Sequence, residues 1–166
     1  MAEEIDETND NKKWKGKVTA RVTKATADQI WRLFADFFHI HKWFPNVPSS
    51  RGVHGANGHP GCVRYCSGFS IPAAGEAAVS WSKERLTAVD HDRRFLSYEI
   101  VDCNIGFQGY ESTVEIVPDG KGCAIEWGFS VDPVESWTLD CLVRKYESAL
   151  EAAARRMEEE IFGSVK

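Results

Sequence analysis

The sequence predicts an α+β fold in which an antiparallel sheet of about seven strands covers a long C-terminal helix. Three observations support this prediction: an alternating strand opens the chain, turn-like segments divide its middle into further strands, and a long amphipathic helix closes it. Strands with one apolar and one polar face are typical of antiparallel sheets that are covered on one side. The closing helix is the element that can cover them.

Residues 13–22 form the first predicted strand, because apolar and polar residues alternate there without a break. The predicted solvated face, whose lysines we expect to serve solubility, carries Lys13, Lys15, Lys17, Thr19 and Arg21. The predicted buried face carries Trp14, Gly16, Val18, Ala20 and Val22.

Two short helices are predicted after this strand. The first, over 26–37, begins with Thr26 three residues before Gln29, which is the spacing of a capping box, and continues with apolar residues at helical intervals. The second lies within HIHKWFP (39–45), and prolines at 45 and 48 end it.

The middle of the chain reads as successive strands, separated by the turn-like segments NGHPG (57–61), DHDR (90–93) and PDGKG (118–122). Two of these strands alternate most clearly. Over 109–117 one face carries Tyr110, Ser112, Val114 and Ile116. Over 121–131 one face carries Cys123, Ile125, Trp127 and Phe129.

The last predicted element is a helix over roughly residues 136–162. Its charged residues lie opposite one apolar stripe, as expected of a helix that packs against a sheet. The stripe consists of Leu139, Leu142, Val143, Tyr146, Leu150, Ala153, Met157 and Ile161.

Length and composition narrow the class of protein. The 166 residues are enough for one domain, which we place at 13–163 behind a disordered acidic tail at 1–12. The net charge of −5, without a block of lysine or arginine, disfavours binding to nucleic acid or to anionic membranes. No apolar run reaches the ~18 residues that a membrane span needs.

The N-terminal residues are acidic and polar, which is unlike a secretory signal, so we expect a cytoplasmic protein. The five cysteines contain no CxxC pair and lie mostly in apolar segments, so we expect reduced thiols that pack as small hydrophobic groups. Neither the cysteines nor HIH (39–41) has the spacing of paired metal ligands, and we expect no metal site. The histidines at 54, 59 and 91 lie in or beside turns and receive no role.

Six motifs, taken in their order and spacing, resemble one known family. They are KWKGKV (13–18), GCVRY (61–65), WSKERLTAVD (81–90), SYEI (97–100), GYESTVEIV (109–117) and EWGF (126–129). Over about residues 12–162 the sequence resembles the START-like and birch-pollen-allergen-like superfamily, also called the polyketide cyclase/dehydrase and lipid transport group. Within it the sequence is most similar to plant lachrymatory-factor synthase-like proteins. The resemblance implies a helix-grip fold, in which a curved sheet wraps the last helix and encloses a hydrophobic cavity.

The resemblance also implies the site residues. In these synthases the arginine of the GCVRY strand and the glutamate of the next strand face the cavity and carry the chemistry, and the matching residues are Arg64 and Glu84. The tyrosines of the two following strands match Tyr98 and Tyr110. We expect these two hydroxyls to orient a ligand, and Trp127 with Phe129 to form an aromatic wall that excludes water. No metal and no organic cofactor is expected.

The residues themselves support the inward placement only in part. An arginine in an otherwise uncharged strand needs water or an anion, and Glu84 turns inward if Lys83 and Arg85 point to water. However, Val79 and Trp81 share the parity of Lys83. Alternation alone therefore leaves the orientation of this strand open.

A carboxylate beside an arginine in an apolar cavity suits cofactor-independent proton transfer, such as isomerisation, cyclisation or elimination of a small, mostly apolar molecule. The resemblance implies that this molecule is a plant metabolite. The lachrymatory substrate itself is not implied, since nothing in the sequence indicates it. The expected partner is this small hydrophobic metabolite, and the expected assembly is a monomer or a weak homodimer.

The sequence leaves several alternatives open. A buried arginine–glutamate pair can be purely structural. A non-catalytic carrier or sensor of the same fold is the second possibility, and SGFSIPA (67–73) is similar to the gate loop of abscisic acid receptors, although the second loop motif of those receptors is missing. The third is an interaction scaffold with a collapsed cavity. We also expect IPAAGE (71–76) to form a lid and 46–60 to shape the cavity entrance.

Overall fold

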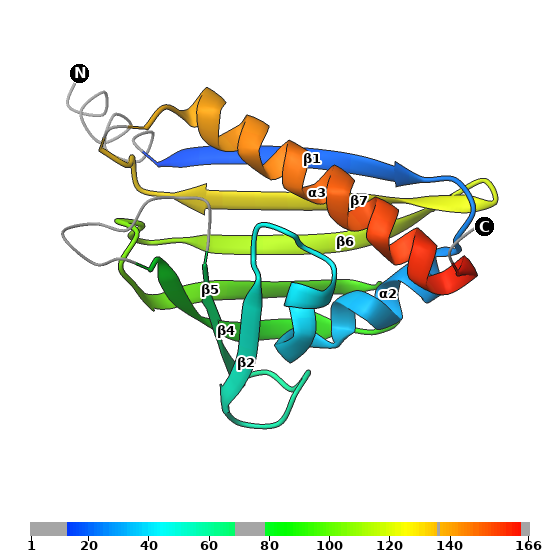
Figure 1. Ribbon diagram of the computed structural model, residues 1–166, viewed down its shortest axis with the longest axis horizontal. Helices are drawn as coiled ribbons and strands as arrows, with labels where there is room; N and C mark the ends of the chain where they lie inside the picture. Colours follow the sequence, from blue (N-terminus) through cyan, green and yellow to red (C-terminus); the bar gives the residue numbers. More distant parts are fainter. Residues whose placement is uncertain (1–12, 69–78, 136, 164–166) are drawn as a thin grey trace, which may run out of the picture.

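The computed structural model describes residues 13–68, 79–135 and 137–163. The predicted tail at 1–12 and the predicted lid at 71–76 lie outside these described residues. The elements in chain order (Figure 1) are β1 (Trp14–Val22), α2 (Ala27–Ala35), the 3₁₀ helix η1 (Phe37–Lys42), β2 (Ser49–His54), β3 (Val63–Ser67), β4 (Trp81–Asp90), β5 (Phe95–Cys103), β6 (Glu111–Asp119), β7 (Gly122–Val131) and α3 (Leu139–Phe162).

The strands form one sheet of seven in the order β1-β7-β6-β5-β4-β3-β2, and each neighbouring pair is antiparallel. The long helix α3 crosses one face of this sheet, and α2 with η1 lies on the same side, next to the C-terminal part of α3 (Figure 1). This arrangement confirms the predicted α+β helix-grip fold. The edge strand β2 lies within the segment 46–60, so that segment extends the sheet.

The capping box predicted for the first helix is present. The Thr26 hydroxyl accepts a hydrogen bond from the Gln29 backbone N–H, and the Gln29 side chain accepts one from the Thr26 N–H. The helix ends at Ala35, two residues before the predicted end, and Phe37 opens η1 instead.

The closing helix starts later than predicted, at Leu139 and not at 136. Thr138 explains this start, because its hydroxyl accepts a hydrogen bond from the Cys141 N–H and satisfies one of the free donors of the first turn. The buried stripe is also narrower than predicted, since Leu139, Val143 and Ile161 are only partly buried.

Alternation correctly predicts the buried faces of the clearest strands. Val18 of β1 lies opposite Trp127 of β7, and Trp127 lies opposite Val114 of β6, with all three side chains buried. These faces pack against the apolar stripe of α3, where Leu142, Leu150, Ala153 and Met157 are fully buried.

The orientation of β4, which alternation left open, is settled by the structure. Ser82, Glu84 and Leu86 are buried, whereas Trp81 is only half-buried and Lys83 is exposed. The Trp81 ring stacks on Tyr65 of β3, with ring centroids 5.7 Å apart. An aromatic pair on the outer face therefore caused the irregular pattern of this strand.

Gly16 is the point of closest approach between β1, Phe129 and α3. A Cβ atom at this position would lie 2.6 Å from the Phe129 ring and 2.9 Å from Cγ2 of Val143. The Phe129 ring is itself fixed, because it stacks on Tyr110 and meets Tyr146 edge to face. We expect Gly16→Ala to lower the free energy of unfolding by about 1–3 kcal/mol through overpacking.

Urea denaturation followed by tryptophan fluorescence measures this change. The matched control is Lys15→Ala on the same strand, whose side chain is exposed, and we expect it to stay within about 0.5 kcal/mol of wild type. Equal stability of the two variants would contradict the proposed close packing.

Candidate functional site

A cavity of about 80 Å³ lies between the sheet, α2, η1 and α3. This volume is several times the ~10–15 Å³ that one water molecule needs, and well below the ~300–1,000 Å³ of sites for drug-sized ligands. The wall is mostly apolar and aromatic, and its side chains include Phe34, Phe37, Ile40, Phe44, Leu96, Ile105, Phe107 and Val114. The cavity therefore suits a small ligand.

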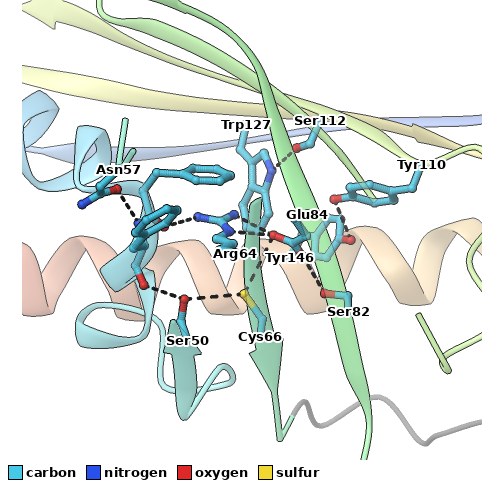
Figure 2. A network of polar contacts seen from close by, with 12 residues as sticks. Ser50, Asn57, Arg64, Cys66, Ser82, Glu84, Tyr110, Ser112, Trp127 and Tyr146 are labelled. Atoms are coloured by element: carbon cyan, nitrogen blue, oxygen red, sulfur yellow. Dashed lines mark hydrogen bonds and ion pairs between the residues drawn. The ribbon is translucent and has the colours of Figure 1, made fainter. Parts of the chain in front are cut away.

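Two oppositely charged side chains form part of this wall. Arg64 of β3 and Glu84 of β4 are register partners on neighbouring strands, so their side chains emerge on the same face of the sheet. Both Nε and Nη2 of Arg64 contact Oε1 of Glu84, at 2.8 and 2.7 Å (Figure 2). The two residues are only 5% and 7% exposed, so solvent screens this ion pair weakly.

The rest of the arginine is held by η1 and by two aromatic rings. Nη1 donates to the Phe37 carbonyl oxygen at 2.9 Å. The guanidinium carbon lies 3.8 Å from the centre of the Phe37 ring and 4.8 Å from that of Tyr98. These cation–π contacts and the carbonyl help to compensate the loss of water around the charge.

The carboxylate is fixed from its own strand and from β3. Ser82 lies two residues before Glu84 on β4 and donates its hydroxyl hydrogen to Oε2 at 2.8 Å (Figure 2). The Cys66 thiol lies 4.0 Å from Oε1 and 3.8 Å from the Ser50 hydroxyl. Glu84 is thus held by a charged and a neutral donor.

The pair keeps unused hydrogen-bonding capacity. Within the described part of the chain, one N–H on each terminal nitrogen of Arg64 has no acceptor, and Oε2 of Glu84 has no donor besides Ser82. A ligand in the cavity can therefore bind through its own oxygen to Arg64 and still offer a proton to Glu84.

A second polar region of the cavity consists of hydroxyl groups that hydrogen-bond to one another and to neighbouring side chains. Tyr146 of α3 donates to the Tyr110 hydroxyl at 2.9 Å (Figure 2). The Tyr98 ring lies 6.3 Å from the Tyr110 ring. Beside them, Trp127 Nε1 donates to the Ser112 hydroxyl, which in turn donates to the Gly128 carbonyl at 2.9 Å. Hydroxyls from β5, from β6 and the residue before it, and from α3 thus lie close together at the cavity.

Burial keeps the neighbours of Glu84 neutral. Burial and the Glu84 charge raise the pKa of Tyr98 to about 12 and that of the Cys66 thiol to about 12. The pKa values of Tyr110 and Tyr146 are raised well above the usual value, mainly by burial. For Arg64, burial opposes the charge, but Glu84 outweighs it and the pKa is raised. Hence the phenols are hydrogen-bond donors at neutral pH, and Cys66 is not a thiolate nucleophile.

The structure brings most of the predicted site residues together. Arg64, Glu84, Tyr98, Tyr110 and Trp127 all line the cavity. Phe129 does not; its ring packs behind Tyr110 and Tyr146.

Several wall residues were missed by the sequence analysis. Tyr146 was assigned only to the apolar stripe of the helix, although a hydroxyl in that stripe was a usable signal. Ser82, two residues before Glu84 and on the same face, could also have been found by parity. Asn46 and Phe37 line the cavity because of the path of the backbone, and no sequence pattern indicates it.

The described residues contain no cluster of three or more His, Cys, Asp or Glu side chains placed to hold a metal ion. Among them, no helix is both long and apolar enough to cross a membrane.

Comparisons with known proteins agree with this fold. Residues 13–161 match the family described as polyketide cyclase/dehydrase and lipid transport. The MLP-like protein 423 of Arabidopsis thaliana is 26% identical over 108 residues, which cover 63% of this chain and 67% of that protein.

Two solved structures show the same fold at low sequence identity. Ginseng major latex-like protein 151 from Panax ginseng superposes with a TM-score of 0.71 at 18% identity, covering 90% of this chain and 97% of that one. The Zhui aromatase/cyclase from Streptomyces sp. R1128 gives 0.73 at 14% identity, covering 92% and 99%.

The raised phenol and thiol pKa values predict a loss of stability in alkali. In the unfolded chain Cys66 and Tyr98 ionise near their ordinary pKa values of 9.0 and 10.0, whereas in the folded protein both ionise only near 12. Between these values the unfolded state binds fewer protons, so the free energy of unfolding falls as pH rises. Tyr98 alone contributes a fall of about 2–3 kcal/mol.

Urea denaturation at pH values from 8 to about 11.5 measures the fall. Tyr98→Phe removes one of the titrating groups, so its curve should descend less steeply than that of wild type. A wild-type stability that stays constant over this range would contradict the burial of these phenols.

The buried ion pair predicts strongly non-additive substitutions. Glu84→Leu leaves the Arg64 charge buried without its anion, and we expect a loss of about 3–5 kcal/mol in the free energy of unfolding. The double variant Arg64→Met/Glu84→Leu removes both charges and should recover most of this loss. Urea denaturation of the single and double variants measures the coupling.

The exposed pair Arg85–Glu99 is the matched control, because it joins β4 to β5 at 2.8 Å on the solvated face. Glu99→Gln should cost less than about 1 kcal/mol. Additive effects of the two cavity substitutions would show that the two charges do not interact.

Proposed function

The chain belongs to the polyketide cyclase/dehydrase and lipid transport family, and from this premise we propose that it is a cofactor-independent proton-transfer catalyst. It acts on a small, mostly apolar metabolite held in the internal cavity. The observation that carries this proposal is the buried contact between Arg64 and Glu84 in the cavity wall, with Nη2 and Oε1 2.7 Å apart. The reaction is an isomerisation, cyclisation or elimination, the class implied by the likeness to lachrymatory-factor synthases.

Glu84 is the proposed base and acid. Its Oε2 accepts one hydrogen bond, from Ser82, and retains lone-pair capacity for a proton from a ligand C–H or O–H. The same oxygen can return that proton to another atom of the ligand, which balances an isomerisation without a cofactor. Ser82 and Arg64 fix the position of the carboxylate, so little reorganisation is needed.

Arg64 is the proposed electrostatic partner. As Glu84 removes a proton, negative charge develops on the ligand, and the two N–H groups of Arg64 that lack protein acceptors among the described residues can bind an oxygen that carries it. The Phe37 carbonyl and the aromatic rings hold the guanidinium in place during this step. Tyr98, Tyr110 and Trp127 are proposed to orient the ligand, the tyrosines through neutral hydroxyl groups.

The alternative is a non-catalytic carrier or sensor of a hydrophobic ligand. The mostly apolar wall favours this alternative, because apolar side chains contribute affinity without taking part in chemistry. The charged pair distinguishes the two functions, since a carrier of apolar molecules needs neither charge. We propose a cytoplasmic location, where the free cysteines would stay reduced, and a monomer or weak homodimer.

Deuterium incorporation from D₂O tests the catalytic proposal without knowledge of the natural substrate. The probes are small ketones of about five to eight heavy atoms, matched to the cavity volume. Wild-type protein should accelerate exchange of the C–H groups next to the carbonyl, and Glu84→Gln should lower the rate by at least about 100-fold while the probes still bind. Proton NMR measures both the exchange and the binding.

The control is Glu99→Gln, which removes a carboxylate from the solvated face of the neighbouring strand and should exchange the probes as wild type does. Equal exchange by wild type and Glu84→Gln would eliminate Glu84 as the base. Binding of probes to wild type without any accelerated exchange would contradict the catalyst and support the carrier.

A further inference from the structure

We infer that residues 41–47, which run from the end of η1 towards β2, form a flap that opens to admit small molecules to the cavity. The flap turns about the backbone at His39, and its open state hydrates polar atoms that the closed state leaves unpaired. Such a flap goes beyond the proposed function, because a catalyst and a carrier both need a route into the cavity.

The flap is a thin wall between the cavity and solvent. Phe44 and Val47 line the cavity, whereas Lys42 and Pro45 are exposed to solvent. In Figure 1 this part of the chain forms the bend that joins η1 to β2. Moving this one stretch outwards therefore connects the cavity with the outside.

The flap holds a concentration of buried polar atoms without partners. Among the described residues, three side-chain nitrogen or oxygen atoms are buried with no hydrogen-bond partner, and all three lie in the flap: Nδ1 of His41, Nε1 of Trp43 and Oδ1 of Asn46. Native structures leave few such atoms unpaired, because each one forfeits a hydrogen bond that water would supply. Opening hydrates all three atoms. It therefore costs less here than in a segment whose buried polar groups are paired.

Hydrogen bonds anchor the chain just before the flap. Arg64 of β3 donates to the Phe37 carbonyl oxygen at 2.9 Å. At Phe38, the carbonyl oxygen accepts from the Ser50 hydroxyl of β2 at 2.8 Å, and the N–H donates to the Asn57 side chain at 2.9 Å. Two strands and a loop thus fix the first half of η1.

The backbone hydrogen bonds of the flap are local. The N–H groups of Trp43 and Phe44 donate to the Ile40 carbonyl oxygen, at 3.1 and 3.2 Å. The Val47 N–H donates to the Phe44 carbonyl oxygen at 2.9 Å, and Pro45 has no N–H to donate. Among the described residues, no backbone hydrogen bond joins 41–47 to the sheet. The flap can therefore swing outwards without breaking a backbone hydrogen bond of the sheet.

The flap has a hinge at one end and an aromatic contact that closes it. His39 leaves the helical conformation inside η1, with φ −115° and ψ 34°, and it lies between the anchored half and the flap. A few such positions absorb the change of backbone angles when a lid moves. The Phe44 ring meets the rings of Phe34 and Trp127 edge to face, with centroids 6.1 and 5.5 Å apart. This apolar contact keeps the closed state predominant, so opening is transient.

Hydrogen exchange of the wild-type protein, followed by NMR in D₂O, tests the opening. The amide protons of Trp43, Phe44 and Val47 should have protection factors at least about 10-fold below that of Leu86. The Leu86 N–H is the reference, because it donates to the Cys62 carbonyl oxygen between β3 and β4 at 2.9 Å. Equal protection of flap and sheet would show that the flap opens only on global unfolding, and would overturn the inference.

Alkylation of Cys66 by iodoacetamide tests entry into the cavity, because Cys66 lines it. Peptide mass spectrometry gives the rate at each cysteine. Cys62 and Cys123 are as deeply buried but lie outside the cavity wall, so they report opening of the rest of the molecule. Cys66 should react at least about 5-fold faster than either. Greater reactivity than Cys123 cannot be the cause, since the pKa is raised to about 12 for Cys66 and only to about 11 for Cys123.

Asn46→Leu tests whether the reagent enters through the flap. It removes an unpaired oxygen at similar side-chain size and so stabilises the closed state, and the labelling of Cys66 should slow by at least about 5-fold while that of Cys62 stays unchanged. Asn57→Leu is the matched control, because the same substitution there removes an oxygen that has a partner, the Phe38 N–H. This control should not slow the labelling of Cys66.

Three labelling results would overturn the inference. Cys66 that reacts no faster than Cys62 and Cys123 in wild type would show that the cavity opens only on general unfolding. An unchanged Cys66 rate in Asn46→Leu would show that the reagent enters by another route. A failure of Asn46→Leu to fold would contradict an oxygen without a structural partner. None of these results involves Glu84, so the ketone exchange experiment decides the proposed function separately.

Discussion

The charged pair of Arg64 and Glu84, buried where a sheet normally places apolar side chains, constrains the architecture around it. Removing two ions from water costs several kcal/mol for each, and their attraction compensates this only when the geometry is good and further hydrogen bonds are supplied. The register of β3 and β4 places the two residues directly opposite each other. The 3₁₀ helix η1 then brings the Phe37 carbonyl to Nη1. The turn between α2 and η1 is thus coupled to the electrostatics of the sheet.

The cavity follows from the same constraint. Around the pair the wall uses small side chains, Ser82 and Cys66, which leave space next to the charges. The large rings of Phe37 and Tyr98 lie against the guanidinium, and the tyrosine hydroxyls hydrogen-bond within the wall. Because burial raises the pKa values of these phenols and of the Cys66 thiol, the hydrogen-bond donors around Glu84 are neutral except for Arg64. A ligand in this cavity therefore contacts a charged pair on one part of the wall and neutral groups on the rest.

The sequence predicted the fold and the charged pair in the cavity wall. It did not predict which of the other side chains line the cavity. Alternation correctly assigns the buried faces of β1, β6 and β7, because those strands have one solvated and one covered face. It leaves the orientation of β4 open, because Trp81 packs on Tyr65 on the outer face of the sheet. Parity also cannot separate Trp127 from Phe129, which share a face of β7, yet only Trp127 lines the cavity. Asn46 lies in an irregular connection with no period, so its position could not be predicted from the sequence.

The size of the cavity separates the two proposed functions in a way that the charges alone do not. A buried ion pair can be purely structural, because apolar replacements are often as stable, so it is the place of this pair in the cavity wall that links it to chemistry. The cavity volume of about 80 Å³ suits a small molecule and lies well below the ~300–1,000 Å³ of sites for larger ligands. A carrier of such larger ligands would have to expand the cavity and move apolar rings away from Arg64. The arginine charge would then lose contacts that compensate its burial. A catalyst for a small polar-ended substrate needs no expansion, since its ligand fits between groups that already have unused donors and acceptors. We therefore propose a small ligand for this cavity.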